Sequence, residues 1–179
     1  LVARKCLPGQ FIIFRVDEFG ERVPLTIADY DREKGTVTIM FQPVGRSTML
    51  LNQLEAGDEL ADFVGPLGKP SNMEGLKRVA VVGGGVGCAI AYPVAKGMHA
   101  KGIEVDMIAG FRSKDIVILE DEMKAASTNL YLVTDDGSYG RKAFTTTILK
   151  ELLDSGKKYD RVIAIGPGLM MKLVADVTK

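Results

Sequence analysis

A glycine-rich segment at residues 78–96 constrains the fold of this chain more than any other stretch. It opens with the valine-rich run 79–82, which is typical of a buried strand in a parallel sheet. Four glycines lie among residues 83–87, and small side chains recur from 89 to 95 at a spacing that favours a helix packed closely on a sheet. A strand, a glycine turn and a helix start together present backbone N–H groups at the positive end of a helix dipole. The segment therefore predicts a site for an anion such as a dinucleotide diphosphate.

This turn does not match the G-x-G-x-x-G fingerprint of the Rossmann fold. Counted from Gly83 or from Gly85, the third glycine position holds a different residue. The acidic residue expected about 20 positions further on is also missing, because the next predicted strand, 105–109, runs into Gly-Phe-Arg-Ser-Lys at 110–114. We therefore expect a nucleotide site of another geometry. The alternative is a turn whose glycines only let the helix pack on its strand.

Length and composition exclude several classes of protein. The 179 residues suffice for one large domain or two small ones, and the net charge is zero. No basic excess indicates nucleic acid, no apolar run approaches the roughly 18 residues that span a bilayer, and no signal-peptide pattern is present. Two cysteines, Cys6 and Cys88, are too few for a cluster held by four thiolates. We expect a cytoplasmic protein with no metal ligands in this chain.

The first 70 residues show a β pattern. Strand-like runs lie at 10–16, 23–28, 36–42 and 59–64, and one helix is predicted at 47–54, with Ser47 or Thr48 as its cap. Turn-forming residues at 66–72 mark a boundary. We therefore predict one domain at 1–70 and a second at 71–179.

The second half alternates between strand and helix patterns. The predicted strands are 79–82, 105–109, 130–133 and 162–165, and the predicted helices are 88–100, 119–126, 142–153 and 169–178. This order is typical of a parallel α/β sheet, in which ligands bind beyond the carboxyl ends of the strands. The loops at those ends are rich in glycine or aspartate and lie at 83–87, 110–114, 134–140 and 166–168.

Several short motifs occur in a fixed order along the chain. The first half contains Arg-Val-Pro-Leu-Thr at 22–26, Met-Phe-Gln at 40–42, Gly-Arg-Ser-Thr at 45–48 and Gly-Pro-Leu-Gly at 65–68. The second half contains Gly-Gly-Gly-Val-Gly-Cys-Ala at 83–89, Thr-Asp-Asp-Gly-Ser-Tyr-Gly at 134–140 and Gly-Pro-Gly-Leu-Met-Met at 166–171. Together these motifs resemble the ferredoxin–NADP reductase superfamily. Within it they are similar to the electron-transfer subunits, such as those of dihydroorotate dehydrogenase, sulfhydrogenase and NADH-dependent reduced ferredoxin:NADP oxidoreductase (sulfide dehydrogenase).

The resemblance implies a ferredoxin reductase-like fold, a β-barrel that binds FAD followed by an α/β domain that binds NAD(P). The chain then lacks the N-terminal strand of the barrel and is truncated at both ends. Thr26 would place its hydroxyl near flavin N5, where hydride arrives, and is the predicted catalytic residue. Arg22 is displaced by one position from the commonest spacing in the family. The implied FAD-binding residues are Arg22, Pro24, Leu25, Thr26, Phe41, Gln42, Gly45, Ser47 and Thr48.

Without the resemblance, the same residues have plain structural interpretations. Arg22 would be a solvated residue, Thr26 an ordinary strand threonine and Ser47 a helix cap. The resemblance implies a second set of residues, which bind NAD(P): Gly83, Gly84, Gly85, Val86, Gly87, Gly110, Arg112, Asp135, Asp136, Gly166, Pro167 and Met170.

Coenzyme preference depends on the loop at 110–114. Arg112 and Lys114 could hold a 2′-phosphate, because guanidinium and ammonium groups pair well with phosphate oxygens. The subunits that this chain resembles generally use NADH, so we expect NAD(H) rather than NADP(H). At Gly166 many relatives have a cysteine that faces the nicotinamide, so no thiol has a role there.

The resemblance also implies partners. Hydride would pass between NAD(P)H and FAD, and electrons would continue to a [2Fe–2S] cluster held by residues beyond Lys179 and to a larger redox subunit in a heteromer, with ferredoxin as a possible acceptor. The identity of the partner, dihydroorotate oxidation or ferredoxin-linked bifurcation, stays open. Two alternatives remain: a stand-alone NAD(P)H:ferredoxin or flavodoxin reductase, and a non-catalytic regulatory module that binds a nucleotide.

Overall fold

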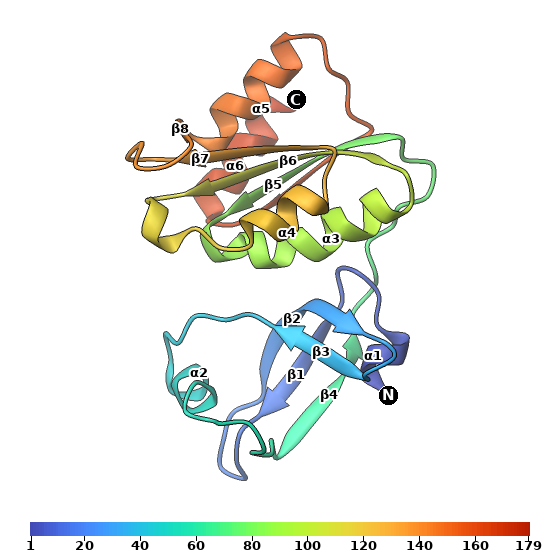
Figure 1. Cartoon of the computed structure of the whole chain (residues 1–179), viewed down its shortest axis with the longest axis vertical. Helices are drawn as coiled ribbons and strands as arrows, with labels where there is room; N and C mark the ends of the chain where they lie inside the picture. The colour runs from blue at the N-terminus through green and yellow to red at the C-terminus, as the bar shows by residue number, and fades with distance from the viewer. The chain divides into compact units, whose positions relative to one another are not determined.

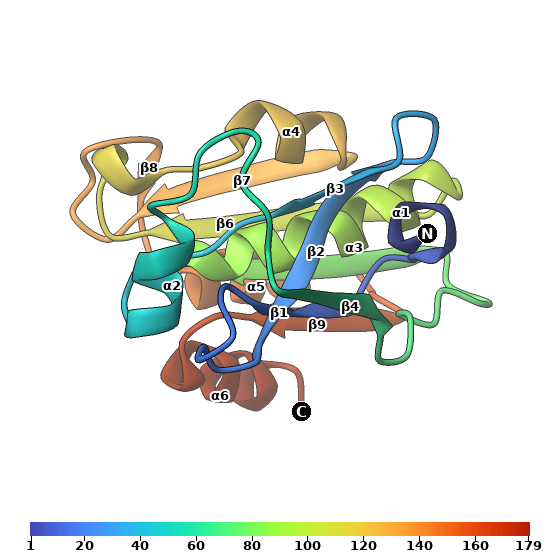
Figure 2. The same ribbon diagram turned by 90° about the horizontal axis from the view of Figure 1, so that it is seen from below.

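The computed structural model describes all 179 residues, and they form two compact units, Leu1–Ser71 and Asn72–Lys179. The first unit holds α1 (Val2–Lys5), β1 (Phe11–Arg15), β2 (Val23–Asp31), β3 (Thr36–Ile39), α2 (Arg46–Leu51) and β4 (Asp62–Leu67). Its strands form one antiparallel sheet in the order β3-β2-β1-β4. The helices α1 and α2 lie at opposite ends of this sheet in both views (Figure 1, Figure 2).

Alternation along β1 separates the two faces of this sheet. Ile12 and Phe14 are fully buried and form a core with Ile27 and Cys6. Their neighbours in β1 are only partly buried, because successive side chains of a strand point to opposite faces. The sheet therefore has one core face and one outward face, and the outward face carries the residues discussed below.

The second unit is a parallel sheet covered by helices on both faces. Its strands are β5 (Arg78–Gly84), β6 (Glu104–Phe111), β7 (Asn129–Thr134), β8 (Arg141–Lys142) and β9 (Arg161–Ile165), in the spatial order β8-β7-β6-β5-β9. The helices α3 (Cys88–Ala100) and α4 (Glu120–Ala125) cover one face, and α5 (Thr145–Asp154) and α6 (Gly168–Val177) cover the other (Figure 1). Short 3₁₀ turns lie at Gly85–Gly87 and Lys114–Ile116.

The valine-rich run forms the centre of this sheet, as expected. Val79 and Val81 pack on the side of α3, and Ala80 and Val82 pack on the side of α5 and α6, all of them fully buried. A strand that is apolar on both faces is what a helix-covered parallel sheet requires. The predicted fold class, a β unit followed by a parallel α/β unit, is confirmed.

Several predicted boundaries were wrong. Gly83 and Gly84 still belong to β5, so the turn itself contains only Gly85–Gly87. The helix predicted at 142–153 begins at Thr145, because Lys142 pairs with Thr134 as part of β8. The strand predicted at 36–42 ends at Ile39, the helix predicted at 47–54 ends at Leu51, and α1 was not predicted at all.

The predicted cap of α2 was also wrong. Gly45 is the N-cap residue, and Thr48 lies at the third helical position. The Thr48 hydroxyl oxygen accepts hydrogen bonds from the N–H groups of Gly45 (3.0 Å) and Val44 (3.1 Å). The threonine thus holds the chain that enters the helix, which is the reciprocal half of a capping box.

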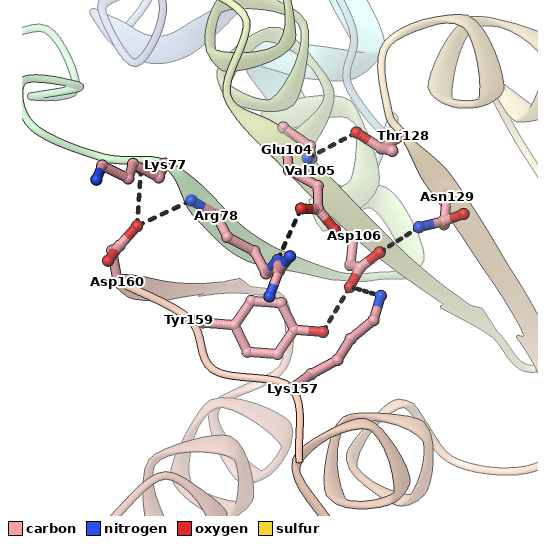
Figure 3. A network of polar contacts seen from close by, with 10 residues as sticks. All are labelled: Lys77, Arg78, Glu104, Val105, Asp106, Thr128, Asn129, Lys157, Tyr159 and Asp160. Carbon is pink, nitrogen blue, oxygen red and sulfur yellow. Dashed lines mark hydrogen bonds and ion pairs between the residues drawn. The ribbon is translucent and has the colours of Figure 1, made fainter. Parts of the chain in front are cut away.

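A polar network joins the amino ends of the strands in the second unit, at the opposite edge from the predicted ligand site (Figure 3). At its centre is the buried carboxylate of Asp106 in β6, which accepts hydrogen bonds from Lys157 (2.6 Å), Tyr159 (2.6 Å) and Asn129 (2.7 Å). Beside it, Asp160 accepts hydrogen bonds from two backbone N–H groups at the start of β5. The network ties the connection between α5 and β9 to β5, β6 and β7.

None of the helices combines the length and the apolar character that a membrane crossing needs.

Candidate functional site

The turn after β5 contains glycines of two kinds. A Cβ atom on Gly83 would lie 2.7 Å from the Cys88 sulfur, and one on Gly84 would lie 2.6 Å from the sulfur of Met170. A Cβ on Gly87 would collide with the main-chain carbonyl oxygen of Ile165. These three glycines are therefore needed for close packing. Gly85 differs, because its φ is +56° and a Cβ there would meet no atom within 4 Å.

The turn after β9 lies directly against the turn after β5. A Cβ on Gly166 would be 3.1 Å from the Cα of Gly84 and 2.9 Å from the terminal methyl of Met170. Pro167 is the N-cap residue of α6, so the start of α6 lies next to the glycine turn that precedes α3. Six residues of the predicted nucleotide set are thereby brought together around open space at Gly85: Gly83, Gly84, Gly87, Gly166, Pro167 and Met170.

The carboxyl ends of β6 and β7 carry the remaining predicted nucleotide residues. The parallel pairing continues past the strands, since the N–H groups of Asp135 and Asp136 bond the carbonyls of Phe111 and Arg112. Gly110 has no room for a side chain because the Thr145 methyl group lies against it. The pairing therefore places Arg112 beside the Asp135–Asp136 pair at the edge where ligands of such sheets bind.

The two aspartates of this loop have different surroundings. Asp136 accepts hydrogen bonds from both the hydroxyl (2.6 Å) and the N–H (2.9 Å) of Ser138, and these bonds lower the pKa of its carboxyl. Ser138 in turn accepts a hydrogen bond from the Lys114 N–H at 2.8 Å. Asp136 thus shapes the loop. The side chains of Asp135 and Arg112 are exposed and make no ion pair, so both remain available to a ligand.

The two cysteines are inert groups in separate units. Cys88 is fully buried beneath Gly83, and burial raises the pKa of its thiol to about 12. Cys6 is buried in the core of the first unit, and burial raises the pKa of its thiol also. No group of three or more His, Cys, Asp or Glu side chains in the chain is arranged to hold a metal ion.

In the first unit, the strand register divides the predicted flavin motif between the two faces of the sheet. Thr26 pairs with Phe11 and Pro24 pairs with Ile13, so both side chains lie on the outward face. Leu25 pairs with Ile12 and packs on the core. A flavin on the outward face would therefore meet the Thr26 hydroxyl and the Pro24 ring, and Leu25 only through its backbone.

An ionic cluster closes one end of this outward face. The Oδ2 atom of Asp62 accepts a hydrogen bond from Nε of Arg15 (2.7 Å) and another from a terminal amino group of Arg22 (2.8 Å). Arg15 and Asp62 are direct partners in the pairing of β1 with β4. Arg22 is exposed but is not simply solvated, since this ion pair fixes its position.

The start of α2 offers a mixed environment to a phosphate. Gly45 is exposed and open, Gln42 is exposed and Phe41 is half-buried. The Ser47 hydroxyl, however, lies 3.5 Å from a carboxylate oxygen of Glu21 and donates toward it. The Thr48 hydroxyl is already used in the cap. Of this predicted set, the Ser47 hydroxyl could exchange its long contact with Glu21 for a phosphate, whereas the Thr48 hydroxyl is occupied by the helix cap.

Sequence reasoning did not identify Arg15 and Asp62. Their opposite charges lie 47 positions apart in the chain, so only the register of β1 with β4 brings them together. Because β1 and β4 are not consecutive strands, no hairpin register predicts this pair, and a bulge between Phe11 and Ile13 shifts the register of the two strands.

Comparison with known proteins places this architecture in the ferredoxin reductase-like class. No protein-family profile matches the chain. A chain of NADH-dependent reduced ferredoxin-NADP oxidoreductase, solved in a study of flavin-based electron bifurcation, superposes with a TM-score of 0.90 at 37% identity, over 98% of this chain and 64% of that one. The oxidoreductase fold predicted from the motifs is therefore confirmed.

Curated relatives define the family within that class. A dihydroorotate dehydrogenase B electron transfer subunit homolog of Thermotoga maritima is 43% identical over 96% of this chain and 60% of its own length. The dihydroorotate dehydrogenase B electron transfer subunit of Fusobacterium nucleatum is 35% identical over 94% of this chain and 67% of its own length. The chain belongs to the family of dihydroorotate dehydrogenase B electron transfer subunits. It spans about 60% to two thirds of the length of these relatives.

Proposed function

We propose that this chain is the FAD- and NAD(P)H-binding part of an electron-transfer subunit. The observation that carries the proposal is the junction of the turns after β5 and β9. There Gly83, Gly84 and Gly87 are needed for packing, and Gly85 alone faces open space with a positive φ. The open space beside Gly85 lies at the start of two helices, and a Cβ at this position would reduce it. Such a site fits the diphosphate of a nicotinamide dinucleotide.

On the nucleotide side, the backbone at Gly85–Gly87 and the start of α3 would hold the diphosphate. The dipoles of α3 and α6 both present their positive ends there. Val86 is partly exposed and would bound the site on the solvent side. Asp135 would accept hydrogen bonds from ribose hydroxyls, and its charge would oppose a 2′-phosphate, which favours NAD(H) over NADP(H).

On the flavin side, the outward face of β1 and β2 would hold the ring. FAD, when bound, supplies hydride acceptance at N5 and the release of electrons one at a time. The Thr26 hydroxyl would donate a hydrogen bond at the reacting edge, and Pro24 would exclude water from the ring face. Arg22 would bind the diphosphate through the donors of its guanidinium that Asp62 does not use.

The relatives are named as electron transfer subunits, which supports a heteromer with a larger redox subunit. From the resemblance of the motifs to electron-transfer subunits we infer that a [2Fe–2S] cluster held by residues outside this chain carries the electrons onward; Cys6 and Cys88 are both buried and lie in different units. A cytoplasmic location accords with this role.

The proposal is tested first by FAD binding. At 100 times its dissociation constant, FAD should stabilise the chain by about 2.7 kcal/mol and raise its melting temperature. Calorimetry with and without FAD measures this shift, with riboflavin as a control that lacks the diphosphate. A folded sample whose melting temperature is the same at saturating FAD would refute the flavin assignment and favour a regulatory nucleotide-binding module.

A second test addresses Thr26. Replacing Thr26 with Val keeps the β-branched shape but removes one hydrogen bond, so flavin reduction by NADH should slow by roughly fivefold, corresponding to about 1 kcal/mol. Thr38→Val is the matched control, because Thr38 is exposed on β3. Stopped-flow bleaching of the flavin reports both rates. Equal rates in the two variants would remove Thr26 from the site.

A further inference from the structure

In the ionic cluster at the end of the outward face, two arginines share one carboxylate oxygen. The Oδ2 atom of Asp62 accepts hydrogen bonds from Arg15 at 2.7 Å and from Arg22 at 2.8 Å. The Arg15 side chain is also bonded to the Glu18 carbonyl at 2.9 Å, so it is held at two points. Arg22 has Asp62 as its only partner and its side chain is 62% exposed.

This geometry gives the three side chains different roles. Arg15 and Asp62 are a cross-strand pair whose side chains are 22% and 26% exposed, which anchors the connection between β1 and β2. Arg22 lies just before β2, four residues from Thr26, so roughly 13 Å of chain separates the two at strand spacing. Its remaining N–H donors form no hydrogen bond within the protein.

We propose that Asp62 is a positioning residue of the flavin site, which holds the Arg22 guanidinium at the end of the outward face where the FAD diphosphate binds. The inference rests on the proposed function and adds to it a residue that touches neither the flavin nor the coenzyme. The hydrogen bond from Arg15, helped by the one from Arg22, lowers the pKa of the Asp62 carboxyl, so this anchor stays charged across the neutral range.

The charge of Asp62 and its contact with Arg22 predict opposite changes in FAD affinity when the carboxylate is removed. A carboxylate near a diphosphate repels it, so on charge alone Asp62→Asn should tighten FAD binding. If Asp62 acts by holding Arg22, the same substitution should weaken FAD binding, because an unanchored arginine must be ordered when FAD binds. The sign of the change therefore distinguishes the two effects.

The experiment is a titration of each apo variant of this chain with FAD, followed by flavin fluorescence anisotropy. We expect Asp62→Asn to weaken binding about tenfold and Asp62→Glu to restore part of that loss. Glu33→Gln is the control of equal charge change, because Glu33 is exposed in the turn between β2 and β3 and its carboxylate forms no hydrogen bond or ion pair. The FAD affinity of this variant should equal that of the parent chain.

The variant Arg22→Ala completes a double-mutant cycle. If Asp62 acts through Arg22, Asp62→Asn should cost nothing further once Arg22 is alanine. Losses that add in the double variant, or an Asp62→Asn chain that binds FAD as well as the parent or more tightly, would overturn the positioning role. Should Asp62→Asn fail to fold, Asp62→Glu takes its place in the cycle: its smaller loss of affinity should disappear once Arg22 is alanine, and a loss that persists would overturn the positioning role. A parent chain that binds no FAD would instead refute the proposed function.

Discussion

The buried carboxylate of Asp106 is a position in the second unit where a single substitution should destabilise the protein strongly. Its side chain is fully buried, and its three donors come from two segments: Lys157 and Tyr159 lie in the connection before β9, and Asn129 lies at the start of β7 (Figure 3). Asp106→Ala leaves all three without their acceptor. Breaking a buried ion pair from one side costs about 3–5 kcal/mol. Because Lys157 keeps 28% exposure and can reach water, we expect about 3 kcal/mol.

The assay is urea unfolding followed by tyrosine fluorescence. Of the five tyrosines only Tyr30 lies in Leu1–Ser71, so the signal reports mainly the second unit. A companion variant replaces both charges, Asp106→Leu with Lys157→Met, and should be less destabilised than Asp106→Ala because no buried charge is left unpaired. A loss below about 1 kcal/mol in Asp106→Ala, or a larger loss in the double variant, would refute this account of the network.

The pH dependence of this effect follows from the two partners. Burial opposes the charge on Asp106, but the hydrogen bonds from Lys157, Tyr159 and Asn129 outweigh it and lower the pKa of the carboxyl. Burial likewise opposes the charge on Lys157, and the bond to Asp106 outweighs it and raises that pKa. The stability from Asp106 is therefore complete above the ordinary aspartate range and is lost as the pH falls through its lowered pKa. The stability from Lys157 is lost only above the ordinary lysine range, so the difference between parent and Asp106→Ala should stay constant from about pH 5 to 9.

Two further predictions concern the nucleotide edge. Gly87→Ala should destabilise the chain by more than Gly85→Ala, because a Cβ at 87 collides with the Ile165 carbonyl oxygen. A Cβ at 85 meets no atom, so that variant bears only the backbone strain of a positive φ, about 1–2 kcal/mol. Thermal melts of the two variants without ligand rank them, and the reverse order would contradict the assignment of Gly87 to packing and of Gly85 to open space. For coenzyme choice, the ratio of flavin-reduction efficiencies at matched, moderate salt should favour NADH, with Arg112→Ala changing it little; a clear NADPH preference that collapses in Arg112→Ala would make Arg112 the specificity residue.

Local periodicity explains the parts of the fold that could be predicted from sequence. The helix predicted at 88–100 has the same bounds as α3, and the strands predicted at 79–82, 105–109, 130–133 and 162–165 lie within β5, β6, β7 and β9. These elements are long and apolar, so neighbouring residues alone define them. The two-residue strand β8 could not be predicted, because it exists only through its pairing with Val133 and Thr134. The early end of β3 was also not predicted: its pairing ends at Ile39, opposite Ile27, although β2 itself continues to Val23.

The separate roles of the glycines at 83–87 could not be predicted from the sequence, for a different reason. The pattern at 83–87 predicts a turn with room for an anion, yet it does not separate a glycine that faces a ligand from one that faces its own protein. That distinction comes from β9 and α6, about 80 residues further on, whose Ile165 and Met170 fill the space beside Gly87 and Gly84. The sequence therefore predicts a ligand at this edge of the sheet, and only packing identifies Gly85 as the open position.

The predicted flavin motif at 24–26 shows why sequence alone does not define the site. The register of β1 with β2 decides which side chains of the motif lie on the outward face. Residues 24–26 are consecutive, and strand alternation alone states that Leu25 faces away from Pro24 and Thr26. Which of the two faces is the core depends on Ile12, which pairs with Leu25 and is fully buried. A slip of one residue between β1 and β2 would turn Thr26 into the core and expose Leu25. The burial of Ile12 and Phe14 therefore determines that the Thr26 side chain lies on the outward face of the sheet.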